Sequence, residues 1–140
     1  MKTRQLETRG KRKDGPVAWC QINTKTYVVI TGVASAFDAS LDVHKLLQSA
    51  VKSLNRRVDH KADGELEDGV FEWLGEPNLR LHANDANDHH LTYGVLSAAL
   101  QAVDNWMSSP GNFHQLAHFQ IFDGDNQVGH AYLTAIGLVT

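Results

Sequence analysis

Residues 91–107 read LTYGVLSAALQAVDNWM, in which apolar side chains recur at every third or fourth position. This spacing places them on one face of a helix, which we predict from Thr92 to Met107. Thr92 is of a residue type that caps helix N-termini, and residues 108–111 (SSPG) are a helix stop signal. The pattern specifies packing rather than chemistry. We therefore predict that this helix is the centre of the core.

A second amphipathic helix is predicted from Leu41 to Arg57, where Asp38 or Ser40 can serve as the N-cap. Its apolar residues recur at helical spacing and are Val43, Leu47, Ala50, Val51, Leu54 and Val58. Strands are predicted where β-branched, aromatic or alternating apolar residues stand between turn signals, at 17–23, 27–33, 70–74, 78–83 and in a hairpin over 116–136. That closing hairpin is predicted to turn within DGDN, residues 123–126.

The predicted elements follow the order β, β, α, β, β, α, β, β along the chain. The middle six, residues 27–123, match the split βαβ arrangement of ferredoxin-like α/β sandwiches. We therefore predict an α+β fold in which an antiparallel sheet carries both helices on one face, since this buries every apolar stripe. The first and last strands are expected to extend the sheet or to pair with another chain. Residues 128–136, with Leu138 and Val139 beyond, are the predicted exposed edge.

The composition predicts one globular domain of ordinary size. The chain has 140 residues, of which 42% are apolar and 21% charged, as is typical of folded proteins. We assign residues 16–140 to a single α/β sandwich domain. Cys20 is the only cysteine, so an intrachain disulfide is excluded and its thiol is predicted to be a small core group. No apolar run approaches the roughly 20 residues that cross a bilayer, so no membrane span is predicted.

Charge is distributed unevenly along the chain. Residues 1–15 hold six basic residues against Glu7 and Asp14, so the remainder must carry −7 to give the formal net charge of −3. We predict that residues 1–15 are a flexible basic arm or a leader, because Lys11-Arg12 suits a dibasic-cutting protease. The segment lacks the apolar stretch of a signal peptide, and removal of a leader would imply secretion. A lone cysteine is also compatible with the cytoplasm. No aromatic residue stands among the charges of the arm, which disfavours nucleic-acid binding.

Histidine is the one titratable residue type that is unusually frequent, with eight copies. His89-His90 lies close to Asp85 and Asp88, and imidazole and carboxylate groups are ligands of zinc-like ions. Acidic residues before a helix also stabilise its N-terminus without any metal. We favour this second interpretation, a capping and solvated loop.

Further histidines fall on the predicted closing hairpin. His114 and His118 are four residues apart, so in a strand they share one face with Gln120. A three-residue hairpin loop would set Gln120 opposite His130. It would also set His118 opposite Tyr132, whereas a two-residue loop would place His118 and His130 on opposite faces. The sequence leaves both registers open.

Two candidate sites follow from the first register. His118, His130 and Tyr132 would suit acid–base catalysis, and His114, His118 and His130 are a possible metal-ligand set. We favour an ordinary exposed sheet face, because antiparallel sheets often face water on one side. No cofactor is predicted, since the chain contains neither a glycine-rich phosphate loop nor a Gly-x-Ser-x-Gly elbow.

Four short motifs carry a resemblance to known proteins: LTYGVL at 91–96, WM at 106–107, FQIFDG at 119–124 and VG at 128–129. Their order is similar to that of small secreted fungal proteins of unassigned function. The architecture suggested for those proteins resembles killer-toxin-like effectors, which are ferredoxin-like α/β sandwiches. The resemblance implies secretion and an effector or toxin-like role. It includes no catalytic motif and therefore implies no site residue.

These observations lead to two main hypotheses of function. The first is a non-enzymatic interaction or self-assembling protein, an exported fungal effector or toxin-like protein, which recruits another chain or a second copy through an edge strand. The alternative is a small metal-assisted or acid–base enzyme that uses the histidines of the closing hairpin. We favour the first. Nucleic-acid binding through the basic arm is a third and weaker hypothesis.

Overall fold

The structure, a computed structural model, describes residues 16–34, 40–76 and 78–135. The basic segment 1–15, the candidate cap Asp38 and residues 136–140 lie outside the described residues. The main elements in chain order are β1 (Val17–Cys20), β2 (Thr26–Ala34), α1 (Ser40–Lys61), β3 (Val70–Gly75), β4 (Leu79–Asp85), α2 (Tyr93–Met107), β5 (Leu116–Asp123) and β6 (Asn126–Ala135).

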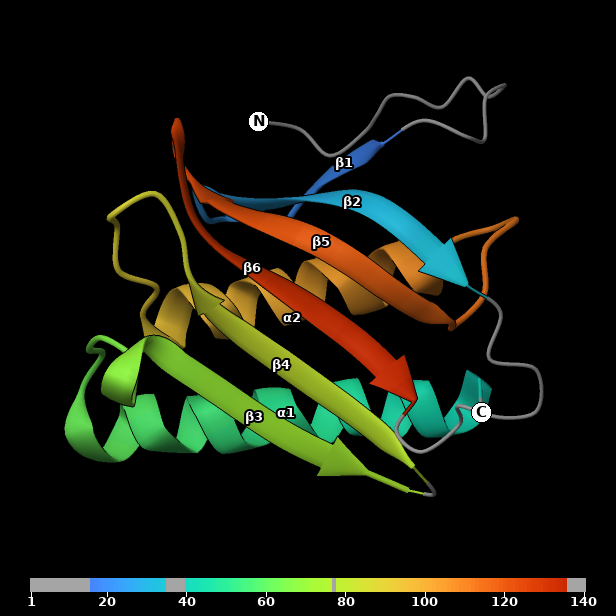
Figure 1. The fold of residues 1–140 in the computed structure, drawn as a ribbon, viewed down its shortest axis with the longest axis horizontal. Coiled ribbons are helices and arrows are strands. Elements are labelled where there is room, and N and C mark those ends of the chain that lie inside the picture. The colour runs from blue at the N-terminus through green and yellow to red at the C-terminus, as the bar shows by residue number, and fades with distance from the viewer. Residues whose placement is uncertain (1–15, 35–39, 77, 136–140) are drawn as a thin grey trace.

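The strands form one six-stranded sheet in the order β1-β2-β5-β6-β4-β3, and every pairing is antiparallel. Both helices pack on the same face of this sheet, with α2 behind β2 and β5 and α1 behind β3 and β4 (Figure 1). Within the described residues, no helix covers the other face, which we call the open face. The predicted α+β class, an antiparallel sheet with two helices on one face, is confirmed.

The order of the strands differs from the ferredoxin-like arrangement. That arrangement would place β2 between β5 and β4, whereas β6 occupies this position and β2 pairs with β1 and β5. The tight turn between β5 and β6 holds these two strands side by side. Because β4 and β5 are both antiparallel to β6, they run parallel to each other and form a split βαβ unit with α2.

The edges of the sheet are β1 and β3, and β6 is an interior strand. The prediction of an exposed edge that begins at Val128 is therefore wrong, since β6 pairs with β5 on one side and β4 on the other. Val128, Gly129, Ala131 and Leu133 of β6 are buried, as the side chains of an interior strand are. The remainder of the predicted edge, with Leu138 and Val139, lies outside the described residues.

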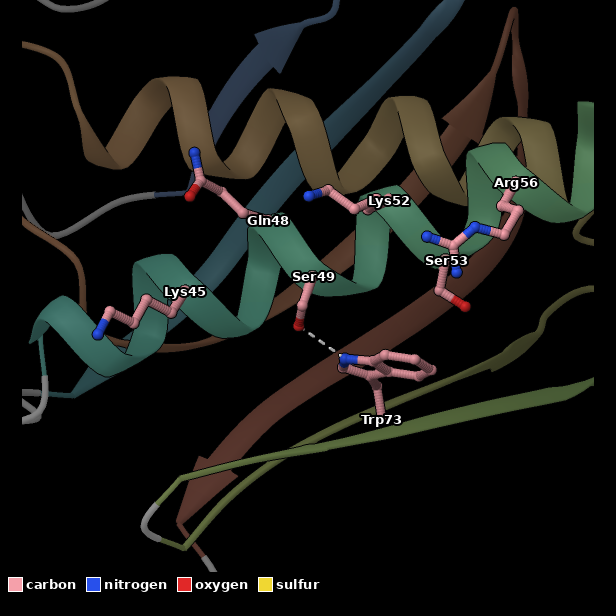
Figure 2. A pocket seen from close by; sticks show the side chains of 7 residues that line it. All are labelled: Lys45, Gln48, Ser49, Lys52, Ser53, Arg56 and Trp73. Atoms are coloured by element: carbon pink, nitrogen blue, oxygen red, sulfur yellow. Dashed lines mark hydrogen bonds between the residues drawn. The ribbon is translucent and has the colours of Figure 1, made fainter.

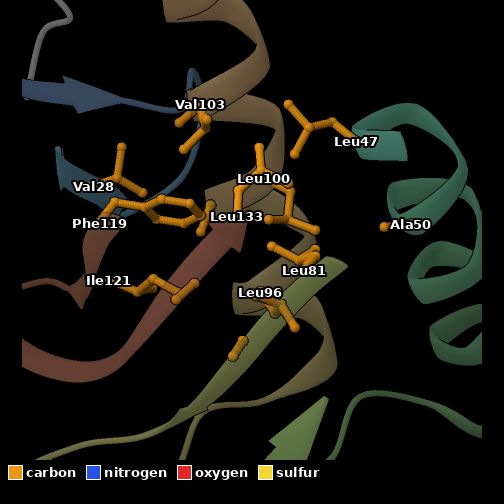
Figure 3. Close-up of a cluster of buried hydrophobic side chains, with 14 of the residues drawn as sticks. Val28, Leu47, Ala50, Leu81, Leu96, Leu100, Val103, Phe119, Ile121 and Leu133 are labelled. Carbon is orange, nitrogen blue, oxygen red and sulfur yellow. The ribbon is translucent and has the colours of Figure 1, made fainter. Parts of the chain in front are cut away.

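The helix α2 forms the centre of the hydrophobic core, as its apolar spacing predicts. Ten of its 15 residues are buried. Figure 3 shows Leu96, Leu100 and Val103 of α2 among apolar side chains from α1 and from the sheet. Thr92 is the N-cap, and its side chain accepts a hydrogen bond of 3.2 Å from the backbone N–H of Val95. The prediction of a Thr92-capped core helix is confirmed.

The register of the β5–β6 hairpin combines features of both predicted alternatives. Asp123 pairs with Asn126, so the turn itself contains two residues. A register shift then follows, because Ile121 pairs with Gly129 and leaves Val128 as the extra residue of a β-bulge. Beyond the bulge, Gln120 faces His130 and His118 faces Tyr132. The bulge therefore produces the pairing that we predicted for a three-residue loop.

Candidate functional site

A groove of about 390 Å³ runs between the outward side of α1 and the edge strand β3 (Figure 2). Basic and polar side chains of α1 form one wall, and an aromatic side chain of β3 forms the other. The lining residues are Lys45, Gln48, Ser49, Lys52, Ser53, Arg56 and Trp73. We call this feature the α1–β3 groove.

The helical repeat of α1 explains why these residues share one wall. Lys45, Lys52 and Arg56 are separated by seven and four positions, which places them on one face of a helix. The apolar residues Val43, Leu47, Ala50 and Leu54, which we predicted to be buried, are turned toward the core. Burial of this stripe fixes the rotation of α1 and therefore holds the basic side chains outward.

Trp73 connects the edge strand to the helix. Its indole Nε1–H donates a hydrogen bond of 2.8 Å to Ser49 Oγ, as Figure 2 shows. The indole ring also lies parallel to the ring of Phe71, with ring centroids 6.0 Å apart. Both aromatic residues pack against the core on the helix side of β3. One hydrogen bond and aromatic packing therefore hold Trp73 in place at the wall of the groove.

The basic residues of the folded domain are concentrated on α1. Residues 1–15 hold six of the 13 Lys and Arg residues of the chain, and five of the other seven lie on α1: Lys45, Lys52, Arg56, Arg57 and Lys61. The Arg57 guanidinium lies 4.2 Å from the centre of the Tyr93 ring, on the α2 side. Within the described part of the chain, the three groove cations Lys45, Lys52 and Arg56 form no salt bridge. The groove is a cationic surface on a domain that carries net negative charge.

The structure brings three of the predicted site residues together on the open face. His118 meets Tyr132 edge-on, with ring centroids 4.6 Å apart, and His130 lies 5.6 Å from the same ring. No hydrogen bond joins these three side chains within the described structure, so none orients another as a base orients a nucleophile. A hollow of about 220 Å³ beside His118 is lined by neither His130 nor Tyr132.

The open face also carries an exposed ion pair. Arg80 Nε donates a hydrogen bond of 2.6 Å to Glu72 Oε2, and His82 Nδ1 lies 3.5 Å from the same oxygen. The hydrogen bond from Arg80 holds the pKa of Glu72 below its ordinary value of 4.5. Because the folded pKa is depressed, the pair stabilises the fold above the unfolded pKa, and this contribution is lost as the pH falls through the folded pKa.

We expect Arg80→Gln to raise the pKa of Glu72 toward its ordinary value, because the main charged donor to its carboxylate is removed. An NMR titration of the Glu72 side chain measures this. His82→Gln is the matched control and should raise the pKa less, since the contribution of His82 is smaller than that of Arg80. A Glu72 pKa that Arg80→Gln leaves unchanged would contradict the assignment.

His114 lies apart from His118 and His130. It precedes β5, and its Nε2 is 2.6 Å from Oδ1 of Asp104 on α2. The same carboxylate oxygen lies 2.8 Å from Nδ1 of His44 on α1. The predicted metal-ligand set of His114, His118 and His130 is therefore not assembled, and His114 belongs to a different cluster.

His89 and His90 are exposed, as in the solvated loop that we favoured, but the carboxylate that binds the first turn of α2 is Asp63, which accepts a hydrogen bond of 2.8 Å from the backbone N–H of Gly94. Asp85 Oδ1 accepts a hydrogen bond of 2.8 Å from the backbone N–H of Leu91, just before α2. Its other oxygen, Oδ2, lies 3.3 Å from Nδ1 of His90, which is an exposed contact. Leu91 precedes the N-cap Thr92, so Asp85 orders the chain before α2 and does not cap the helix itself.

Sequence reasoning missed the α1–β3 groove and the cluster around Asp104. A signal was present for each: the basic residues of the domain gather in one predicted helix, and Asp104 is the only carboxylate of α2. Asp104 also lies in the last turn of that helix, where the helix dipole disfavours a negative charge. The place of Trp73 in the wall of the groove could not be predicted, because it depends on which strand lies beside α1.

No known protein family, curated protein sequence or solved structure matches this chain. Neither α1 nor α2 is both long enough and apolar enough to cross a bilayer. We therefore infer a function from the geometry and charge of the site.

Proposed function

We propose that this protein is a non-enzymatic interaction module that binds an extended acidic segment of a partner protein along the edge strand β3. The distribution of charge supports the proposal: the cations of the domain are concentrated on α1, and three of them line a groove beside that edge. The partner would add a strand to the sheet, and its carboxylates would meet Lys45, Lys52 and Arg56.

The position of β3 supports strand addition. β3 is the outermost strand and, within the described residues, pairs only with β4, so one side of its backbone is available for a further ladder of hydrogen bonds. An added strand lies about 4.8 Å from its neighbour, and every second side chain points to the same face of the sheet. A segment with acidic residues at alternate positions would therefore present them to the α1–β3 groove.

Charge also argues against a second copy of this chain as the partner at this edge. Pairing β3 with β3 of another copy would bring the two α1 helices close together, with Lys45, Lys52 and Arg56 of each copy facing like charges. Like charges across an interface suppress association. An acidic partner turns the same charges into an attraction, so we choose a partner protein over self-association.

We expect a short labelled peptide with glutamate at alternate positions to bind at low ionic strength, and its lysine counterpart not to bind. Lys52→Glu should weaken the binding of the glutamate peptide about tenfold, since it removes an attraction and adds a repulsion. Fluorescence anisotropy of the peptide measures the affinity. Binding should weaken as salt is added, because the groove is exposed to solvent.

Lys25→Glu is the matched control for this experiment. It makes the same change of charge at an exposed residue. Lys25 lies in the turn between β1 and β2, toward the edge of the sheet opposite β3. It should leave the affinity close to that of the unmodified protein. Absence of binding at millimolar peptide, or an equal loss of affinity in both variants, would refute the groove as the binding site.

The exported, fungal effector-like role that the resemblance implies stays a prediction, as does secretion after loss of residues 1–15. The groove would bind an extended acidic segment whether the protein acts inside or outside the cell. The enzyme hypothesis stays a separate prediction. His118, His130 and Tyr132 contact one another through their rings, and such contacts do not orient a catalytic base.

A further inference from the structure

Three side chains from distant parts of the sequence converge beside the C-terminal end of α2. His44 lies in the first half of α1, Asp104 in the last turn of α2, and His114 in the segment that leads into β5. Nδ1 of His44, Oδ1 of Asp104 and Nε2 of His114 form a triangle with sides of 2.8, 2.6 and 3.1 Å. Among the described residues, this is the one group of three or more potential metal ligands that come together.

We propose that this triangle binds one divalent ion of the zinc class, with His44, Asp104 and His114 as its protein ligands. Two imidazoles and a carboxylate are ligand types that suit zinc and neighbouring transition metals rather than magnesium or calcium. Zinc–ligand bonds of about 2.0–2.2 Å place the donor atoms of a tetrahedral site about 3.3 Å apart. Small side-chain rotations would widen the observed triangle to that size.

The hydrogen bonding of the cluster also favours an ion. Both imidazoles approach the same carboxylate oxygen, so each facing nitrogen must carry a hydrogen to donate to it. Two N–H groups then converge with their nitrogens only 3.1 Å apart. A metal ion would replace both hydrogens and turn this crowded arrangement into three bonds to one centre.

The cluster is partly buried, so water can still reach a metal ion bound there. The side chains of His44, Asp104 and His114 are 31%, 18% and 15% exposed. Three protein ligands leave the fourth position of a tetrahedral ion open to water or to a small ligand. The ion would also join α1, α2 and the start of β5, which are three separate elements of the fold. We therefore expect it to stabilise the domain as well as to bind.

We expect equilibrium dialysis followed by elemental analysis to find one zinc ion per chain of the untagged full-length protein, and no calcium or magnesium. Cobalt should give the visible absorption of a four-coordinate ion. At free zinc about a hundred times its Kd, the thermal midpoint should rise by about 10 °C.

Asp104→Asn and His44→Gln should each weaken zinc binding more than about tenfold and reduce the thermal shift. His44 is the more exposed ligand, so its variant tests the site even if Asp104→Asn folds poorly. His118→Gln, which removes a histidine outside the cluster, is the matched control and should bind zinc as the unmodified protein does. The proposal is overturned if the protein binds no stoichiometric zinc. It is also overturned if Asp104→Asn and His44→Gln both bind zinc as tightly as the control.

Discussion

Leu100→Asp should leave the domain unfolded at room temperature. Leu100 is fully buried at the centre of α2, and Figure 3 shows it among side chains of α1 and the sheet. Loss of a buried leucine side chain costs about 2–5 kcal/mol, and an unpaired buried carboxylate costs several kcal/mol more. Native domains are stable by only about 5–15 kcal/mol, so the substitution consumes most or all of that margin.

Circular dichroism and urea denaturation measure the outcome, and Leu41→Asp is the control. Leu41 lies in the first turn of α1 and its side chain is 61% exposed, so the same substitution buries no charge there. A new carboxylate at that helix N-terminus interacts favourably with the helix dipole. The control should therefore unfold at the same urea concentration as the unmodified protein or slightly above it. A soluble Leu100→Asp variant that unfolds cooperatively would refute the central place of α2.

The elements of the fold could be predicted because each has a local signal. The apolar repeat of residues 91–107 and the cap at Thr92 predict α2 almost to the residue. Alternation along β5 places His118 and Gln120 on one face, as predicted, and the buried Ala117 and Phe119 lie on the other. A side chain's face depends only on the spacing within its own element, which is why one sequence suffices to predict it.

The order of the strands could not be predicted in the same way. Spacing indicates which face of a strand is buried but not which strand lies beside it. The split βαβ interpretation predicted β2 between β5 and β4. In the structure, β6 lies there. This one exchange places β6 inside the sheet and leaves β1, rather than β6, as the edge opposite β3. β3 is an edge strand in both orders, so the new result is the interior place of β6.

The two candidate sites show the same limit. His44 and Asp104 are 60 residues apart and meet only because α1 and α2 pack side by side. The predicted cluster on the closing hairpin depended on the pairing within one pair of strands, and the structure pairs His118 with Tyr132, as in one of the two registers that the sequence left open. The sequence limited this pairing to two registers, and the bulge at Val128, which the sequence did not predict, decides between them. Contacts between side chains of two helices can be predicted only when the packing of the helices is known.

Gly129 marks the closest approach between β6 and its surroundings. A Cβ atom at this position would lie 2.7 Å from Leu91 Cδ2 and 2.9 Å from the backbone oxygen of Asn84. The leucine side chain is fully buried, and the oxygen belongs to the neighbouring strand β4, so neither atom can move without disturbing the core or the sheet. Gly129 also follows the bulge at Val128, which sets the register of the hairpin. Only glycine fits the observed backbone at this point.

We therefore expect Gly129→Ala to lower the free energy of unfolding by about 1–3 kcal/mol, the usual cost of forcing extra volume into a packed site. The control is Gly32→Ala in β2, where an added Cβ would meet no atom within 4 Å. There the loss of unfolded-state entropy should leave stability unchanged or raise it by up to about 1 kcal/mol. Urea midpoints at constant slope measure both changes. If Gly129→Ala is as stable as Gly32→Ala, β6 does not lie against Leu91 and β4 as closely as the structure shows, and the interior place of β6 is wrong. Opposite signs for these two substitutions would support the place of β6 between β5 and β4.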